Sequence, residues 1–250
     1  MKMQEIKTTT GSVLLAIAWS IIDYIERDAL ENDVDPRGYL IRAPELERAL
    51  EGFSSRLPRK VRVGVSPYPG DYSVELYNGV IVVFEELDGD GLGYEAFVNS
   101  VYRLPFIYDK GVIRGSALIT SSTGTEYMFL YLSDGRLVHL EGARYKVSIP
   151  FLKNTVSSLH THPEGSCMLS YADVDSALDS LVNGSILSGA ATSRCAVILR
   201  RKGILTEDDY VELKRFSNFL RKKSDRRTLE TRIYELKRKL SSVVLEAFNY

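Results

Sequence analysis

The sequence predicts an α/β protein in which helices flank a central mixed sheet, an α+β extension precedes it and a helix follows it. Three features predict this fold class: an apolar helical segment at residues 12–25, strand-like apolar runs between residues 61 and 199, and helical spacing after residue 206. The 250 residues are 44% hydrophobic and 26% charged, which is typical of a soluble globular protein with a core of useful size. The net charge of −1 predicts no general attraction to nucleic acid or acidic membranes.

Residues 1–110 are expected to form an N-terminal α+β module of unknown role, because no group of catalytic side chains stands out in them. Residues 12–25, SVLLAIAWSIIDYI, predict a buried helix. Its uncharged core is shorter than the roughly 20 residues of a membrane span, and no small-x-small cleavage site of a secretory signal follows. A charged helix is expected around Ala43–Phe53. Three strands, the last two joined by a hairpin turn at Asn78-Gly79, are expected at Val61–Val65, Tyr72–Tyr77 and Val80–Phe84.

A second domain is expected at residues 111–205. Its first part predicts three strands, separated by a polar turn at Ser121–Thr125 and a turn at Asp134-Gly135: Val112–Ile119, Tyr127–Leu132 and Arg136–Leu140. The last of these strands carries His139, which is expected to be structural.

Two of the three histidines stand one residue apart in the stretch VSSLHTHPEGSCMLSYADV, residues 156–174. Strand alternation places His160 and His162 on the same face, where both imidazoles can reach one ion. Ser170-x-x-Asp173 predicts the start of a helix, with the serine as its N-cap and the aspartate reaching back. Two neutral imidazoles and one carboxylate form a three-ligand zinc set whose fourth position is left for water, as in catalytic sites.

At these residues the chain resembles the JAMM (JAB/MPN-plus) metalloproteases, whose signature is H-x-H-P followed by S-x-x-D. His160-Thr161-His162-Pro163, Ser170 and Asp173 match that signature position for position. The resemblance covers roughly residues 112–200 and implies a JAB/MPN-like central sheet there. It also implies that His160, His162 and Asp173 bind Zn²⁺ and that Ser170 supports the oxyanion of the reaction.

The resemblance further implies a glutamate on an earlier strand as general acid/base. Glu126, which opens the apolar run Tyr127–Leu132, is the candidate, and Glu141 is the alternative. A carboxylate suits this role for a physical reason. Zinc lowers the pKa of its water towards roughly 7, but the proton must still be taken up and then passed to the leaving amine.

The two cysteines, Cys167 and Cys195, leave two outcomes open. A disulfide would clamp the loop that carries the ligands, whereas two separate thiols are usual in a cytosolic protein. The strand Cys195–Leu199 is expected to lie beside the histidine strand.

Residues 206–250 are expected to form a basic C-terminal helical segment. Thr206 predicts an N-cap, with helix following from Tyr210, and residues 211–240 carry eleven Lys and Arg against four Asp and Glu, a net +7. The apolar residues follow a 4-3-4-3-4 spacing typical of a coiled-coil seam: Leu229, Ile233, Leu236, Leu240, Val243 and Ala247. Such a helix either packs on its own domain or forms a dimer or partner contact. Nucleic acid is the less favoured partner, because no aromatic platform or recognised nucleic-acid module accompanies the charge.

The resemblance implies a zinc-dependent isopeptidase or peptidase, which removes a ubiquitin-like modifier or trims the C-terminus of a small protein, and a cytoplasmic location is expected. One alternative is a RadC-like, DNA-repair-associated protein, since those proteins carry a similar core. The other is a non-catalytic MPN-type interaction scaffold, although the intact ligand set argues against it. No membrane partner is expected.

Overall fold

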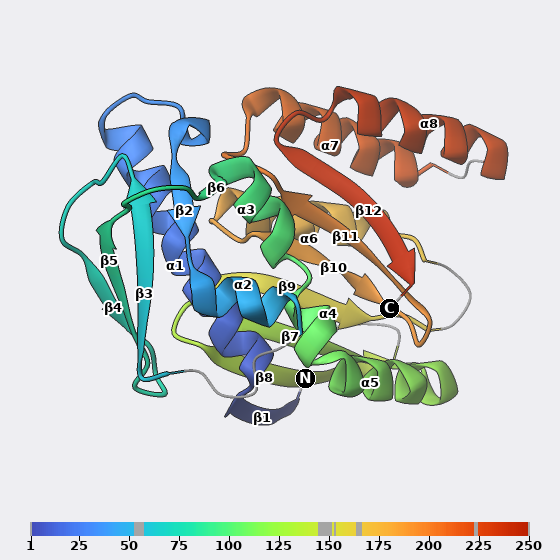
Figure 1. Cartoon of the computed structure of the whole chain (residues 1–250). Coiled ribbons are helices and arrows are strands. Elements are labelled where there is room, and N and C mark those ends of the chain that lie inside the picture. Colours follow the sequence, from blue (N-terminus) through green and yellow to red (C-terminus); the bar gives the residue numbers. More distant parts are fainter. Residues whose placement is uncertain are drawn as a thin grey trace. The chain divides into compact units, whose positions relative to one another are not determined.

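Figure 1 shows the computed structural model of the chain, which describes residues 2–52, 58–144, 152, 154–163, 167–222 and 225–249. The chain divides into two compact units. The N-terminal unit holds Ile6–Lys110 and Tyr131–Val138, and the C-terminal unit holds Met1–Glu5, Gly111–Leu130 and His139–Tyr250. The basic segment 206–250 is therefore part of the C-terminal unit. Among the described residues, no helix combines the length and hydrophobicity that crossing a bilayer requires.

The N-terminal unit contains a mixed sheet of order β4-β5-β3-β2-β6, in which β3 and β5 are parallel. Its strands are β2 (Leu40–Arg42), β3 (Lys60–Ser66), β4 (Ser73–Glu75), β5 (Ile81–Glu86) and β6 (Leu92–Gly93). Its helices are α1 (Thr10–Glu31), α2 (Pro44–Leu50), α3 (Tyr94–Val101) and α4 (Leu104–Tyr108), with a 3-10 turn at Pro36–Gly38. The buried helix at residues 12–25 and the antiparallel pairing of β4 with β5 across Asn78-Gly79 are confirmed. The expected helix end at Phe53 lies outside the described residues.

The N-cap of helix α1, Thr9, contacts the buried carboxylate of Asp109. The Thr9 hydroxyl accepts the N–H of Ser12 (2.9 Å) and donates to Oδ2 of Asp109 (3.0 Å). A Cβ at Gly11 would lie 2.3 Å from the same oxygen, so glycine is required at this close approach. Asp109 is 3% exposed, and burial raises the pKa of its carboxyl to about 6, outweighing the opposing effect of the bond from Thr9.

The C-terminal unit contains most of a mixed sheet of order β1-β8-β7-β9-β10-β11-β12. The strands are β1 (Lys2–Thr8), β7 (Thr125–Leu132), β8 (Arg136–Arg144), β9 (Thr155–Thr161), β10 (Leu187–Ala191), β11 (Cys195–Arg201) and β12 (Val243–Asn249). The helices are α5 (Lys110–Thr123), α6 (Tyr171–Val182), α7 (Glu207–Leu220) and α8 (Arg226–Lys239). Strands β9 and β10 are parallel and are connected through α6, so these three elements form a βαβ unit.

One hydrophobic core holds α6, α7 and α8 against β10, β11 and β12. Its buried side chains include Val174, Leu178, Val197, Leu199, Leu213, Phe216, Leu236, Leu240, Val243 and Leu245. Figure 1 shows α7 and α8 as neighbouring helices beside β12. Each large aliphatic side chain buried in this way contributes roughly 1.5–3 kcal/mol. The apolar side of α8 is therefore used within its own unit.

The expected strand Val112–Ile119 is wrong, because these residues belong to helix α5. The buried positions are Ile113, Ser116, Ala117 and Thr120, which follow helical spacing rather than alternation. Two of these four residues are polar, so the buried stripe does not stand out by hydrophobicity. Gly124, at φ 74°, adopts the left-handed conformation that ends the helix.

The coiled-coil seam is also wrong beyond Leu240, because the chain leaves α8 there and returns as strand β12 beside β11. The change of direction is fixed by Asp209 of α7, which is fully buried. Its carboxylate accepts backbone N–H groups from Ser241 (2.9 Å), Ser242 (2.7 Å) and Val243 (2.8 Å). These hydrogen bonds hold the first residues of β12 against α7.

Strand β11, which begins at Cys195, does not lie beside the histidine strand as expected. Strand β10 lies between the two, pairing with β9 on one side and β11 on the other. The sequence of β10, LSGAA, has little strand propensity. Gly189 is needed there because a Cβ would lie 2.3 Å from the carbonyl oxygen of Val197. Because close backbone packing requires small residues in β10, its sequence gives no clear signal for a strand.

The buried carboxyl of Asp109 predicts a pH-dependent stability. Its pKa is raised from 3.8 to about 6 on folding, so the folded state binds the proton more tightly. The free energy of unfolding should therefore fall as the pH rises from about 4 to about 6 and then level off. Asp109→Asn should remove this component and should be more stable than the wild type at pH 8, by on the order of 3 kcal/mol. Urea unfolding of both proteins between pH 4 and pH 8 measures the difference, and parallel stability curves would contradict the assignment.

Candidate metal centre

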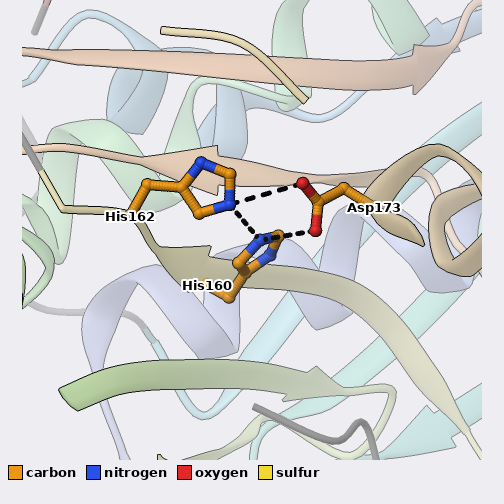
Figure 2. A group of neighbouring side chains, drawn as sticks. All are labelled: His160, His162 and Asp173. Atoms are coloured by element: carbon orange, nitrogen blue, oxygen red, sulfur yellow. Dashed lines mark hydrogen bonds and ion pairs between the residues drawn. The ribbon is translucent and has the colours of Figure 1, made fainter. Parts of the chain in front are cut away.

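The two histidines of the predicted motif lie at the carboxyl end of β9. His160 is the next-to-last residue of the strand, and His162 directly follows it. Strand β10 supports this end, because the His162 N–H donates to the carbonyl of Ala191 (2.9 Å). Figure 2 shows both imidazoles turned towards Asp173, as the alternation of the strand predicts.

Asp173 lies in the first turn of α6, and the predicted capping box is confirmed. The Ser170 hydroxyl accepts the N–H of Asp173 (3.2 Å), and Oδ2 of Asp173 accepts the N–H of Ser170 (2.6 Å). The cap uses the Ser170 hydroxyl only as an acceptor, so its proton can be donated to another group. The apolar side of α6 packs in the core, and this fixes the turn that carries the carboxylate.

Three ligand atoms converge at this point (Figure 2). Nε2 of His160 lies 2.9 Å from Nε2 of His162 and 3.0 Å from Oδ1 of Asp173, and Nε2 of His162 lies 3.3 Å from Oδ2. The exposed fractions of the three side chains are 10–15%. In the described part of the chain, this is the group of His, Cys, Asp or Glu ligands close enough together to hold an ion.

The donor set fits a divalent cation. In a tetrahedral zinc site with bonds of about 2.0–2.1 Å, two ligand atoms are roughly 3.3 Å apart. The separations of 2.9 Å between the two Nε2 atoms and of 3.0 Å between Nε2 of His160 and Oδ1 of Asp173 are slightly shorter than that value. Oδ2 of Asp173 is already used by the Ser170 N–H, which leaves Oδ1 to bind the ion. The two Nε2 atoms face each other at 2.9 Å, and two unprotonated imidazole nitrogens would repel each other at that distance. A proton on one of them, or a cation bound by both, removes this repulsion.

The charges of the cluster also suit an ion. Burial raises the pKa of the Asp173 carboxyl, but hydrogen bonds from His160 and His162 outweigh it and hold that pKa far below its usual range. Burial lowers the pKa of His162, but the hydrogen bond to Asp173 and the charges of Asp173 and Glu126 more than compensate, so its pKa is raised. The site thus attracts positive charge, either as a proton on His162 or as a bound cation.

The structure joins Cys167 and Cys195 in a disulfide, one of the two outcomes that the sequence left open. Their Cα atoms are 6.1 Å apart and 28 residues separate them along the chain. The backbone carbonyl of Met168, which follows Cys167, accepts a hydrogen bond from the His162 ring. A backbone partner of this kind fixes the orientation of a ligand imidazole. The disulfide therefore links the loop that orients His162 to the first residue of β11.

The two glutamate candidates lie on different strands. Glu126 is the second residue of β7, the strand next to β9, and is close enough for its charge to raise the pKa of His162. Glu141 lies on β8, which is one strand further from β9. His139, also on β8, stacks on Phe129 with ring centroids 4.7 Å apart and lies 3.4 Å from the Ser116 hydroxyl, which is a structural environment.

Sequence reasoning missed two buried threonines beside the site. Thr161, between the histidines, bonds to Thr120 of α5 and to the Tyr127 N–H. A polar residue at a buried strand position was a usable signal for Thr161. No such signal marked Thr120, because its segment was expected to be a strand and a turn.

Comparison of the whole chain with protein-family models, with curated proteins and with solved structures finds no match.

The cluster predicts one divalent ion per chain. The metal-free protein should bind about one equivalent of Zn²⁺ in equilibrium dialysis, and binding should raise the melting temperature by mass action. His162→Ala and Asp173→Ala should each lose this ion, because two ligands remain. Asp175→Ala is the matched control: it removes a carboxylate from the same helix that pairs instead with Lys214 and Arg221, and it should retain the ion. Equal zinc content in all four proteins would contradict the assignment.

Proposed function

We propose that the chain is a zinc-dependent hydrolase of the JAMM (JAB/MPN-plus) type. The observation that carries this proposal is the convergence of His160, His162 and Asp173 with Glu126 on the adjacent strand. The fold supports it, because a βαβ unit places the histidines at the end of β9 and the carboxylate in the first turn of α6. A JAB/MPN-like arrangement of the C-terminal unit is part of the proposal.

Zinc is the proposed ion because two imidazoles and one carboxylate are the ligands it takes in catalytic sites with an open fourth position. When bound, it would act as a Lewis acid and generate a nucleophile from water near neutral pH. The chain's own residues would supply the rest of the chemistry.

Glu126 would serve as the general base and then as the general acid. Its carboxylate takes a proton from the attacking water as the C–O bond forms, and it delivers that proton to the nitrogen as the C–N bond breaks. The Ser170 hydroxyl, which the helix cap uses only as an acceptor, would donate a hydrogen bond to the developing oxyanion. The bond cleaved is an amide, and the substrates proposed are conjugates or C-terminal extensions of a ubiquitin-like modifier.

The two alternatives have less support. A non-catalytic MPN-type scaffold does not need a complete ligand set, whereas this chain has one. A RadC-like role at DNA would use the basic segment 211–240, but six of the ten cations that the structure describes in this segment form ion pairs within the unit. These six are Lys214, Arg215, Arg221, Arg226, Arg232 and Lys239. Pairing reduces the charge that is left for phosphates.

The proposal predicts zinc-dependent cleavage of amide bonds after the modifier's C-terminus. Zinc-loaded protein should cleave members of a panel of ubiquitin-like proteins carrying either a peptide extension or an isopeptide-linked lysine. Glu126→Gln should lower kcat/KM by about 10²–10⁴-fold with unchanged zinc content, and Glu141→Gln should remain near the wild type. Gel and mass-spectrometric assays measure both. If zinc-loaded wild type cleaves no member of the panel, or if Glu141→Gln abolishes cleavage while Glu126→Gln does not, the proposal fails.

A further inference from the structure

Thr161 links the histidine strand to the strand that carries Glu126. It lies between His160 and His162 on β9 and is fully buried. Its hydroxyl accepts the backbone N–H of Tyr127 on β7 at 2.8 Å. The same oxygen lies 2.6 Å from the hydroxyl of Thr120 on α5.

Thr120 continues this network and is also fully buried. Its hydroxyl lies 2.8 Å from the carbonyl oxygen of Thr125 and 3.0 Å from that of Ser116. Through the contact with Thr125, the network connects again to β7, at the residue that directly precedes Glu126.

The protons of these groups can be counted. Each hydroxyl has one proton to donate, and the Tyr127 N–H can only donate. The carbonyls beside Thr120 can only accept, so the single Thr120 proton goes to one of them, of which that of Thr125 is the nearer. Thr161, which accepts from Tyr127, then donates its own proton to Thr120. The chain of hydrogen bonds thus starts at the amide just after Glu126 and ends at the carbonyl just before it.

We propose that Thr161 and Thr120 are positioning residues that hold Glu126 in place relative to the ligand histidines. Thr161 is the last residue of β9 and stands directly between those histidines. In addition to the pairing of β7 with β9 in the sheet, two buried hydroxyls therefore constrain the distance from Glu126 to the metal centre. Buried networks of this kind are rigid when every member is satisfied, and a displacement of about 1 Å of a catalytic group is costly for the reaction. The role assigned to Glu126 rests on the proposed function, whereas the positioning itself does not.

The first test needs no substrate. Thr161→Val keeps the shape of the side chain and removes its hydroxyl, whereas Thr161→Ser keeps the hydroxyl. In the metal-free protein, Thr161→Val should accelerate hydrogen exchange of the Tyr127 amide by at least about tenfold, and Thr161→Ser should not. In protein loaded with Co²⁺, all variants should hold about one ion, but the paramagnetic shifts of the Glu126 side-chain protons should change only in Thr161→Val. Unchanged exchange and unchanged shifts would overturn the proposal.

The second test uses the substrate found for the zinc-loaded protein. Thr161→Val should lower kcat by at least tenfold with KM near the wild-type value, and Thr161→Ser should restore the rate. In a Glu126→Gln background, Thr161→Val should have no further effect, because it acts through Glu126. An equal loss in both backgrounds would mean that Thr161 has a general structural role and would overturn the proposal.

Two outcomes separate this inference from the proposed function. If the zinc-loaded wild type hydrolyses nothing, the proposed function fails, while the exchange and cobalt measurements still decide the positioning. If Thr161→Val does not fold, Thr120→Val breaks the same network from α5 and should produce the same changes in exchange and in the Glu126 shifts, with Thr120→Ser as its control. Wild-type behaviour of Thr120→Val would overturn the proposal.

Discussion

One carboxylate both starts a helix and faces the histidines. One oxygen of Asp173 accepts the N–H of Ser170 and closes the capping box of α6, and the other lies 3.0 Å from His160. The two tasks are compatible because the N-terminus of a helix carries a partial positive charge and stabilises an anion. Together with the hydrogen bonds from His160 and His162, this keeps the carboxylate charged where burial would otherwise favour its neutral form. Helix α6 must begin at the candidate metal centre, and the neighbouring elements are arranged to hold it there.

The elements that hold α6 come from the end of the chain. Its apolar side lies in the core of the C-terminal unit. Asp175 on its polar side pairs with Lys214 of α7 and with Arg221, which directly follows α7. Helix α7 is joined in turn to the start of β12, where Asp209 accepts three consecutive backbone N–H groups. The basic segment therefore has a structural task within its own unit, and much of its positive charge is used there.

Sequence reasoning succeeded where the chemistry is local. The caps at Ser170 and Thr206 were predictable because each is a contact between a side chain and a backbone group three residues away. The same holds for the shared face of His160 and His162. It failed where burial depends on distant partners: α5 buries hydroxyls that bond across the sheet, and β10 is a strand because Gly189 permits close packing against β11. The start of β12 depends on Asp209, which no local pattern reveals.

The βαβ unit has a consequence for how the ligand set assembles. His160 and His162 stand at the end of β9, and Asp173 stands where the crossover enters α6, so all the ligands lie in one short, continuous piece of chain. Bringing such ligands together requires closing only a small loop, and the entropy cost of closure grows with loop length. The contact order of the site is therefore low. During folding, β9, the following loop and the start of α6 can bind an ion before the more distant strands of the sheet have paired.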